Sequence, residues 1–181
     1  MHNKTSESGF SYVDVMIAVT ILLVGCMAML SAITSGVVMT TTSQQTIAAK
    51  QYALSTIEAI FSARDLDNLQ WAAVGNVGDT AIPAGAFLTG DQPMYIDPGK
   101  DGVVGTADDK AGPNGTVGDA DDQPAVAGFT RSIRITDIPD PDRPGSPISL
   151  RQIDVTISYF IGRALERETV TTFIANYRTG D

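Results

Sequence analysis

The chain has 181 residues, a hydrophobic fraction of 43% and a formal net charge of −9 at pH 7. It is long enough to bury a core, and it lacks the basic balance expected of a nucleic-acid-binding protein. Its only cysteine is Cys26 and its only histidine is His2. These counts exclude an intrachain disulfide framework and a His/Cys zinc site, and they disfavour an enzyme; nothing indicates an organic cofactor.

A long apolar segment follows the polar start of the chain. No charged residue occurs from Val15 to Ala49, and the strongly apolar part ends at about Met39. About 20 apolar residues in a helix cross the hydrocarbon core of a bilayer, whereas a secretory signal has an apolar stretch of only about 7–15. No A-x-A-like cleavage site follows. The segment therefore predicts a membrane-spanning helix.

The helical pattern continues beyond this apolar segment. After a polar patch at residues 40–46, apolar side chains recur at spacings of three, four and seven, which places them on one helical face. They are Ile47, Leu54, Ile57, Ile60 and Phe61. We predict one helix over residues 11–64, roughly 80 Å long at 1.5 Å per residue, whose second half packs on the rest of the chain.

One acidic residue, Asp14, stands at the start of the apolar segment. A charged side chain at the centre of a membrane helix costs about 2.5–3.5 kcal/mol, and less near its end. Asp14 either marks the helix entrance, where a carboxylate suits the helix dipole, or it has a partner outside the helix.

Residues 9–25, "GFSYVDVMIAVTILLVG", resemble the N-terminal signal of type IV pilins and type II secretion pseudopilins, and "AAKQYALSTIEAIFSAR" at 48–64 resembles the second helical half in that family. The resemblance implies that a prepilin peptidase removes leader residues 1–9 after Gly9 and that the new N-terminal Phe10 is methylated. Asp14 then takes the place of the glutamate usual at the fifth mature position. Its implied role is to meet the amino group of a neighbouring subunit's Phe10.

The same resemblance implies a structural subunit with a single-pass anchor in the bacterial inner membrane and a head outside the cytoplasm. Residues 10–39 would form the filament core, and the partners would be other pilin or pseudopilin subunits, the prepilin peptidase, an inner-membrane assembly platform and, before assembly, membrane lipid. A minor pilin of a type IV pilus or related filament is the leading interpretation, and a secretion pseudopilin is the alternative. A single-pass calcium-binding or adhesive module that does not assemble is the alternative of another class.

The most polar part of the head, which is predicted over residues 65–181, is an acidic repeat at residues 97–122. "DGVVGTADD" (101–109) aligns with "NGTVGDADD" (114–122) at six of nine positions, and the repeat holds seven aspartates and two lysines. A structureless loop of this length is improbable inside a compact domain unless it is disordered or organised by a ligand. The alternatives are a solvated acidic loop and a cation site.

The first copy resembles an EF-hand-like calcium loop with Asp97 at position 1, Asp101 at 5, Gly102 at the sharp turn, Val103 supplying its carbonyl at 7, and Asp108 at 12. Gly99 at position 3 offers no side-chain oxygen. An oxygen-only ligand set in an adaptable loop favours calcium over magnesium. The candidate ligands are Asp97, Asp101, Val103, Asp108, Asp109, Asn114, Asp119, Asp121 and Asp122.

Strand patterns follow the repeat. Apolar and polar residues alternate in residues 129–135, 151–160 and 168–177, and a turn near Gly162 joins the last two into an antiparallel hairpin. We predict an α+β fold in which the long N-terminal helix, with a transmembrane half and an amphipathic half, packs its second half on a small antiparallel sheet of three or four strands. This build also resembles pilins.

Overall fold

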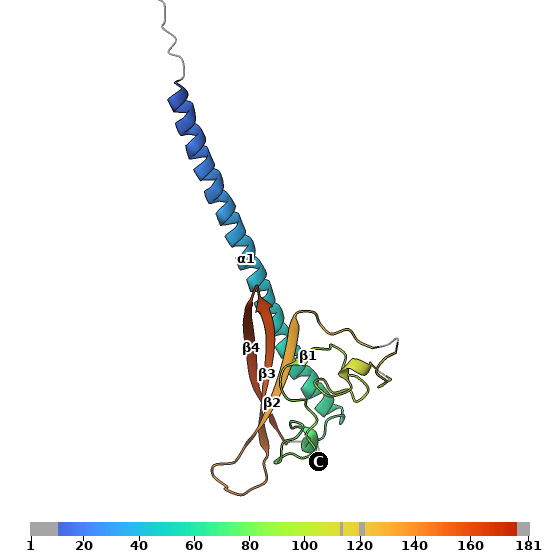
Figure 1. Ribbon diagram of the computed structural model, residues 1–181. Helices are drawn as coiled ribbons and strands as arrows, with labels where there is room; N and C mark the ends of the chain where they lie inside the picture. The colour runs from blue at the N-terminus through green and yellow to red at the C-terminus, as the bar shows by residue number, and fades with distance from the viewer. Residues whose placement is uncertain (1–10, 113, 120–121, 177–181) are drawn as a thin grey trace, which may run out of the picture. The chain divides into compact units, whose positions relative to one another are not determined.

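A computed structural model describes residues 11–112, 114–119 and 122–176. It has a single long α-helix, α1 (Tyr12–Asp65), which begins and ends one residue later than predicted (Figure 1). The chain divides into two units, residues 1–44 and 45–181, so that α1 contributes to both. Each unit is described by itself.

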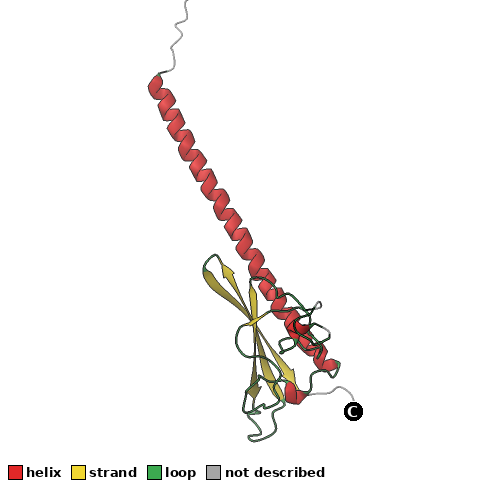
Figure 2. Ribbon diagram, turned by 45° about the vertical axis from the view of Figure 1, so that its right-hand side comes forward, coloured by secondary structure: helices red, strands yellow, loops and turns green. Residues whose placement is uncertain are grey.

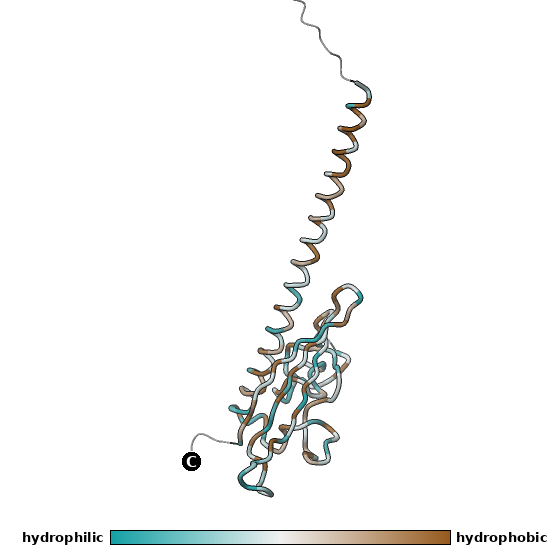
Figure 3. The backbone as a smooth tube through the Cα atoms, turned by 90° about the vertical axis from the view of Figure 1, so that its left-hand side faces the viewer, coloured by the Kyte–Doolittle hydropathy of each residue, from teal (hydrophilic) through white to brown (hydrophobic). Residues whose placement is uncertain are grey.

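The described part of the first unit is an apolar helix. Its large side chains are exposed on every side, among them Val13, Ile21, Leu30 and Val38, and no residue of its most apolar window is buried. Figure 3 shows the same stretch as an almost continuous hydrophobic segment. By length and composition, this is the one helix in the described chain that could span a membrane.

The second unit is the head, in which one four-stranded antiparallel sheet has the order β1-β2-β3-β4. The strands are β1 (Gln92–Pro93), β2 (Phe129–Ile138), β3 (Leu150–Ile161) and β4 (Ala164–Ala175) (Figure 2). The predicted hairpin is confirmed: β3 and β4 pair along all twelve residues, joined by a turn at Gly162 and Arg163. The sequence did not indicate β1 or the short 3₁₀ helices η1 (Trp71–Ala73) and η2 (Asp109–Ala111).

The core lies between the second half of α1 and one face of the sheet. Alternate residues of β2 and β3 are buried there, as the period-2 pattern predicts, with Ile153, Val155 and Ile157 wholly inaccessible. On α1 the buried stripe differs from the predicted one. Ile57 and Ile60 are buried, but so are Ala49 and Ala53, whereas Ile47 and Leu54 remain about half exposed. Two small alanine side chains therefore belong to the buried stripe, and the larger Ile47 and Leu54 lie outside it.

Two polar anchors hold the irregular segment between α1 and β1 against the sheet. Asn76 donates from Nδ2 to the Ile133 carbonyl (2.7 Å) and accepts from the Ile135 N–H (2.8 Å), so its amide occupies the edge of β2 that the two-residue β1 does not reach. Arg151 donates to the carbonyls of Trp71 (2.6 Å) and Val74 (2.8 Å), and its guanidinium lies 4.3 Å from the centre of a Trp71 ring. Buried backbone groups thereby keep their partners.

Candidate functional site

The predicted assembly residues fall partly within the described chain. Gly9 and Phe10 lie outside the described residues, whereas Asp14 lies in the first turn of α1. The Asp14 N–H bonds to the Ser11 carbonyl (3.0 Å), and its side chain is exposed and makes no ion pair with another described residue. Asp14 is the only charged residue of α1 before Lys50. The helix thus presents one carboxylate beside an otherwise apolar surface.

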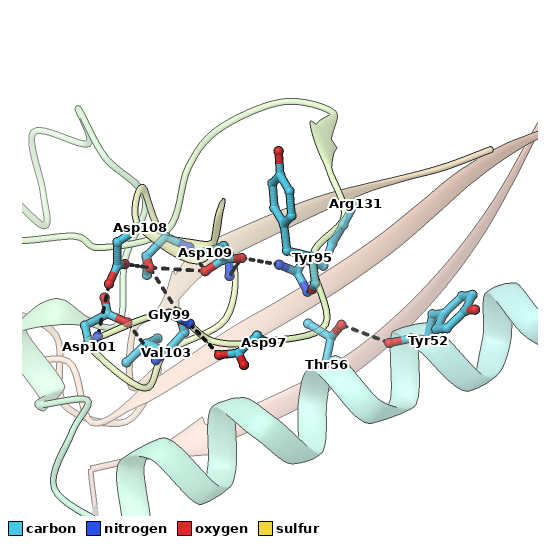
Figure 4. A network of polar contacts seen from close by, with 12 residues as sticks. Tyr52, Thr56, Tyr95, Asp97, Gly99, Asp101, Val103, Asp108, Asp109 and Arg131 are labelled. Carbon is cyan, nitrogen blue, oxygen red and sulfur yellow. Dashed lines mark hydrogen bonds and ion pairs between the residues drawn. The ribbon is translucent and has the colours of Figure 1, made fainter. Parts of the chain in front are cut away.

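The first copy of the acidic repeat forms a compact turn structure held by polar contacts (Figure 4), and its two valines are part of the core. Asp97 Oδ1 accepts the Gly99 N–H (3.1 Å) and Asp101 Oδ1 accepts the Val103 N–H (2.7 Å). Gly102, predicted for the sharp turn, has a φ of 71°, which suits glycine. Val103 and Val104 are buried. The predicted alternative of a merely solvated loop therefore does not describe this copy, because its middle is part of the head's core.

Asp101 and Asp108 are brought together across the turn. Asp108 Oδ2 accepts the backbone N–H groups of Lys100 (2.9 Å) and Asp101 (3.0 Å), and its Oδ1 accepts the Thr106 hydroxyl (2.8 Å). Partial burial, reinforced by the neighbouring Asp108 carboxylate, raises the pKa of Asp101. Burial also opposes ionisation of Asp108, but the hydrogen bonds from Thr106 and Asp101 outweigh it and lower the pKa of Asp108. Two carboxyl groups this close favour sharing a proton or a cation.

Asp109 has a different environment from its neighbour. It is buried; its Oδ2 accepts from the Gly105 N–H (2.8 Å) and from Arg131 Nη2 (2.6 Å), and its Oδ1 accepts from the Thr106 N–H (3.2 Å). Burial raises the pKa of Asp109, against the lowering effect of these donors. In this structure Asp109 joins the acidic loop to β2 through a buried ion pair.

Arg131 is the residue of this site that the sequence analysis did not single out. It lies on the inward face of β2, the same face as the buried Ile133 and Ile135. Only 5% of its side chain is exposed. It also donates to the Tyr95 carbonyl (3.4 Å). The sequence does place an arginine at an inward-facing position of the predicted strand. Because a buried guanidinium needs an acidic partner, this position could have indicated an ion pair.

The second copy of the repeat lies against the first. A side chain at Gly115 would meet the Lys100 side chain at 2.8 Å, and the Gln123 N–H bonds to the Lys110 carbonyl (3.0 Å). Asn114 Nδ2 donates to Asp119 Oδ2 (2.8 Å), and Asp122 Oδ2 accepts the Gly118 N–H (2.9 Å). The other Asp122 oxygen, Oδ1, is buried without a hydrogen-bond partner. Asp121 lies outside the described residues.

The predicted calcium ligands are therefore brought together only in part. The structure places Asp101 against Asp108 and directs Asp109 to Arg131, and within the described residues no three His, Cys, Asp or Glu side chains converge on one point. The carboxylates of each copy are occupied mainly by backbone N–H groups of the same copy.

The chain has no match among protein-family models, curated proteins or solved structures. Its resemblance to pilins and pseudopilins rests on the residues of the N-terminal segment quoted above.

The Asp109–Arg131 pair leads to a stability prediction. Arg131→Met should lower the free energy of unfolding by about 3–5 kcal/mol, because it leaves the Asp109 carboxylate buried without its cation. Denaturant unfolding of the detergent-solubilised chain, followed by the fluorescence of Trp71, measures this loss. The matched control is Arg143→Met, which removes an ion pair with Asp140 at the exposed Arg143 side chain and should change stability little. Equal effects of the two substitutions would contradict a structural role for the buried pair.

Proposed function

We propose that this chain is a structural, pilin-like subunit that is inserted in a bacterial inner membrane and then drawn into a type IV pilus or related filament. The observation that carries the proposal is the first half of α1, which is apolar on every side and bears a single carboxylate in its first turn. Such a surface needs an apolar environment, which is lipid before assembly and neighbouring helices afterwards.

The role of Asp14 follows from the same environment. A carboxylate in an apolar bundle is costly without a partner, whereas two opposite unit charges about 4 Å apart gain roughly 4 kcal/mol at an effective dielectric near 20. Cleavage after Gly9 would create an amino group on Phe10, four residues before Asp14 in the chain. Within a bundle of such helices, Asp14 of one subunit can pair with Phe10 of the next, which fixes the stagger between them.

The head supports the proposal by its architecture. An α+β head in which one sheet packs on the second half of a long N-terminal helix leaves the first half free for the filament core. Among filament subunits, a minor pilin remains our leading proposal and a secretion pseudopilin the alternative. A membrane-anchored module that does not assemble differs from both, because it has no need of cleavage or of a charge at residue 14.

We also propose that the acidic repeat of this subunit binds calcium. The supporting observations are the facing Asp101 and Asp108 carboxyl groups and the buried, unpartnered Oδ1 of Asp122. Asp97, Asp101 and the Val103 carbonyl would contribute from the first copy. Oxygen ligands of this kind suit a hard cation. Calcium would relieve the repulsion among these carboxylates and stabilise the head.

The first test is processing of the N-terminus. In cells that contain a prepilin peptidase, the mature chain should begin at an N-methylated Phe10, because Gly9 presents no side chain to the peptidase. Mass spectrometry of the purified chain measures this start. Replacing Gly9 with a bulky residue should leave the leader attached. A mature chain that keeps residues 1–9 in such cells would exclude the pilin proposal and favour the plain membrane anchor.

The second test concerns Asp14. Asp14→Ala should leave membrane insertion intact or improved but lower incorporation into filaments, because the amino group of the neighbouring Phe10 then lacks a partner. Asp14→Glu is the matched control, and it should incorporate like the parent chain. The measurements are the membrane fraction of the cell and the sheared filament fraction. If Asp14→Ala enters filaments as well as the parent, the carboxylate only marks the helix entrance.

The third test is calcium binding by the full chain in detergent. Calorimetry should give a weak Kd of roughly 10⁻⁴ to 10⁻³ M, as in extracellular modules, because Gly99 offers no ligand. At calcium a hundredfold above Kd the head should gain about 2.7 kcal/mol. Asp101→Asn with Asp108→Asn should abolish the gain, whereas Asp140→Asn with Asp142→Asn, outside the repeat, should not. No heat and an unchanged melting temperature would establish a loop without a cation.

The shifted pKa of Asp101 adds a pH dependence to this test. A raised folded pKa means that the calcium-free folded chain holds this proton more tightly than the unfolded chain. The stability from Asp101 is therefore present below its unfolded pKa and is lost as the pH rises through the folded pKa. Calcium binds the ionised form, so it should raise the melting temperature more at pH 7 than at about pH 4.

A further inference from the structure

We propose that the tip of the β3–β4 hairpin is a membrane-contact site that binds the phospholipid headgroup layer before the subunit assembles. The site consists of Phe160, Arg163 and Leu165. The inference rests on the proposed membrane insertion of α1, and it adds a second point of contact between the subunit and the bilayer.

An exposed apolar pair lies next to the hairpin turn. Phe160 of β3 and Leu165 of β4 are direct cross-strand partners, and they are 58% and 46% exposed. Phe160 alternates with the buried Tyr159, so the pair lies on the face of the sheet that is turned away from the core. Two large apolar side chains opposite each other at a strand end form a small patch that water does not favour.

An exposed guanidinium stands at the turn itself. Arg163 makes no ion pair or hydrogen bond with another described residue. The charges that follow along β4 are partly neutralised, since Arg167 pairs with Asp91 (3.2 Å) and Glu168 with Lys50 (3.8 Å). The chain as a whole has a net charge of −9, but the charged residue in the turn is basic. The nearest acidic residue after it in the chain is Glu166, three residues later.

The turn is located at the end of the head from which the chain continues toward the membrane anchor. Tyr159 Oη and the Thr46 hydroxyl share a hydrogen bond of 2.9 Å, and Glu168 meets Lys50 one helical turn later. Tyr159 is nearer to the turn than Glu168, and its partner Thr46 precedes Lys50 in α1. The turn end of the hairpin therefore points toward the N-terminal end of this part of α1. It extends three residues past Tyr159, or about 10 Å.

The chain that connects the head to the apolar segment is short enough for this tip to reach the bilayer. The apolar segment ends at about Met39, seven residues before Thr46. Seven residues span about 10 Å as a helix, and at most about 25 Å in any conformation. Headgroups add about 5–8 Å to each side of the hydrocarbon core, so the hairpin tip can reach them.

The chemistry of the tip fits a phospholipid surface better than open water. Aromatic and aliphatic side chains partition to the boundary between headgroups and acyl chains, and a guanidinium forms strong paired hydrogen bonds with phosphate. Phe173 offers an internal comparison. It is 53% exposed on the same face of the sheet, but it lies eight residues along β4 from Leu165, or about 26 Å, at the opposite end of the head.

The experiment uses the full chain, with Cys26→Ser, in vesicles of phosphatidylethanolamine and phosphatidylglycerol. An environment-sensitive fluorophore is attached to one introduced cysteine: Phe160→Cys, Leu165→Cys, Phe173→Cys or Ile21→Cys. Brominated acyl chains in the same vesicles quench a fluorophore that contacts lipid. We expect fluorescence to be lost at residues 21, 160 and 165 and retained at 173. Arg163→Glu should restore much of the fluorescence lost at residue 165.

The label at Ile21 separates the two proposals. If it is quenched while residues 160 and 165 are as bright as 173, the hairpin does not touch lipid and this inference is wrong, although the anchor stands. If Ile21 itself is not quenched, the proposed membrane insertion fails as well. A signal at residue 160 that varies with the density of protein in the vesicles, and not with brominated lipid, would show contact with a second copy and would also overturn the inference.

Discussion

The contact between the second half of α1 and the inner face of the sheet is the constraint on which the head depends. Ala49, Ala53, Ile57 and Ile60 of α1 belong to the same buried cluster as the inward-facing residues of β2 and β3. α1 is the only α-helix among the described elements, and it buries the apolar faces of β2 and β3 together with irregular segments that contribute residues such as Phe87 and Val103. Only the second half of α1 takes part in this interface, and the first half keeps its apolar side chains exposed.

The acidic repeat depends on the same core. Val103 and Val104 pack into it, and the Asp109–Arg131 pair joins the repeat to β2. A highly charged segment is thereby held at a defined place on the head, although its carboxylates repel one another. A loop held at two points keeps its remaining acidic groups near each other, so the proposed binding of a cation would cost less ordering than in a free loop.

The polar contacts of the head have distinct physical roles. Asn76 replaces the missing part of β1 along the edge of β2, and Arg151 connects η1 to β3 through its carbonyl contacts and Trp71. Both satisfy buried backbone groups that would otherwise cost free energy. The surface of the head also carries exposed apolar side chains that do not contribute to the core, such as Phe160 and Leu165 at the hairpin tip. Contacts outside the chain are therefore best sought at such features.

Local periodicity determined most of the secondary structure in this chain. The apolar segment, the absence of glycine and proline from Val37 to Arg64, and the alternation in β2, β3 and β4 each depend on near neighbours in sequence. The α+β fold was predictable from them. The tertiary structure decided the contacts between residues that are distant in sequence. Alanines, and not Leu54, face the sheet, and Asn76 completes the edge of β2. Asp109 forms an ion pair with Arg131, whereas Asp101 lies against Asp108. The aspartates look alike in sequence, and they differ only in which buried donors and charges the folded chain brings to each.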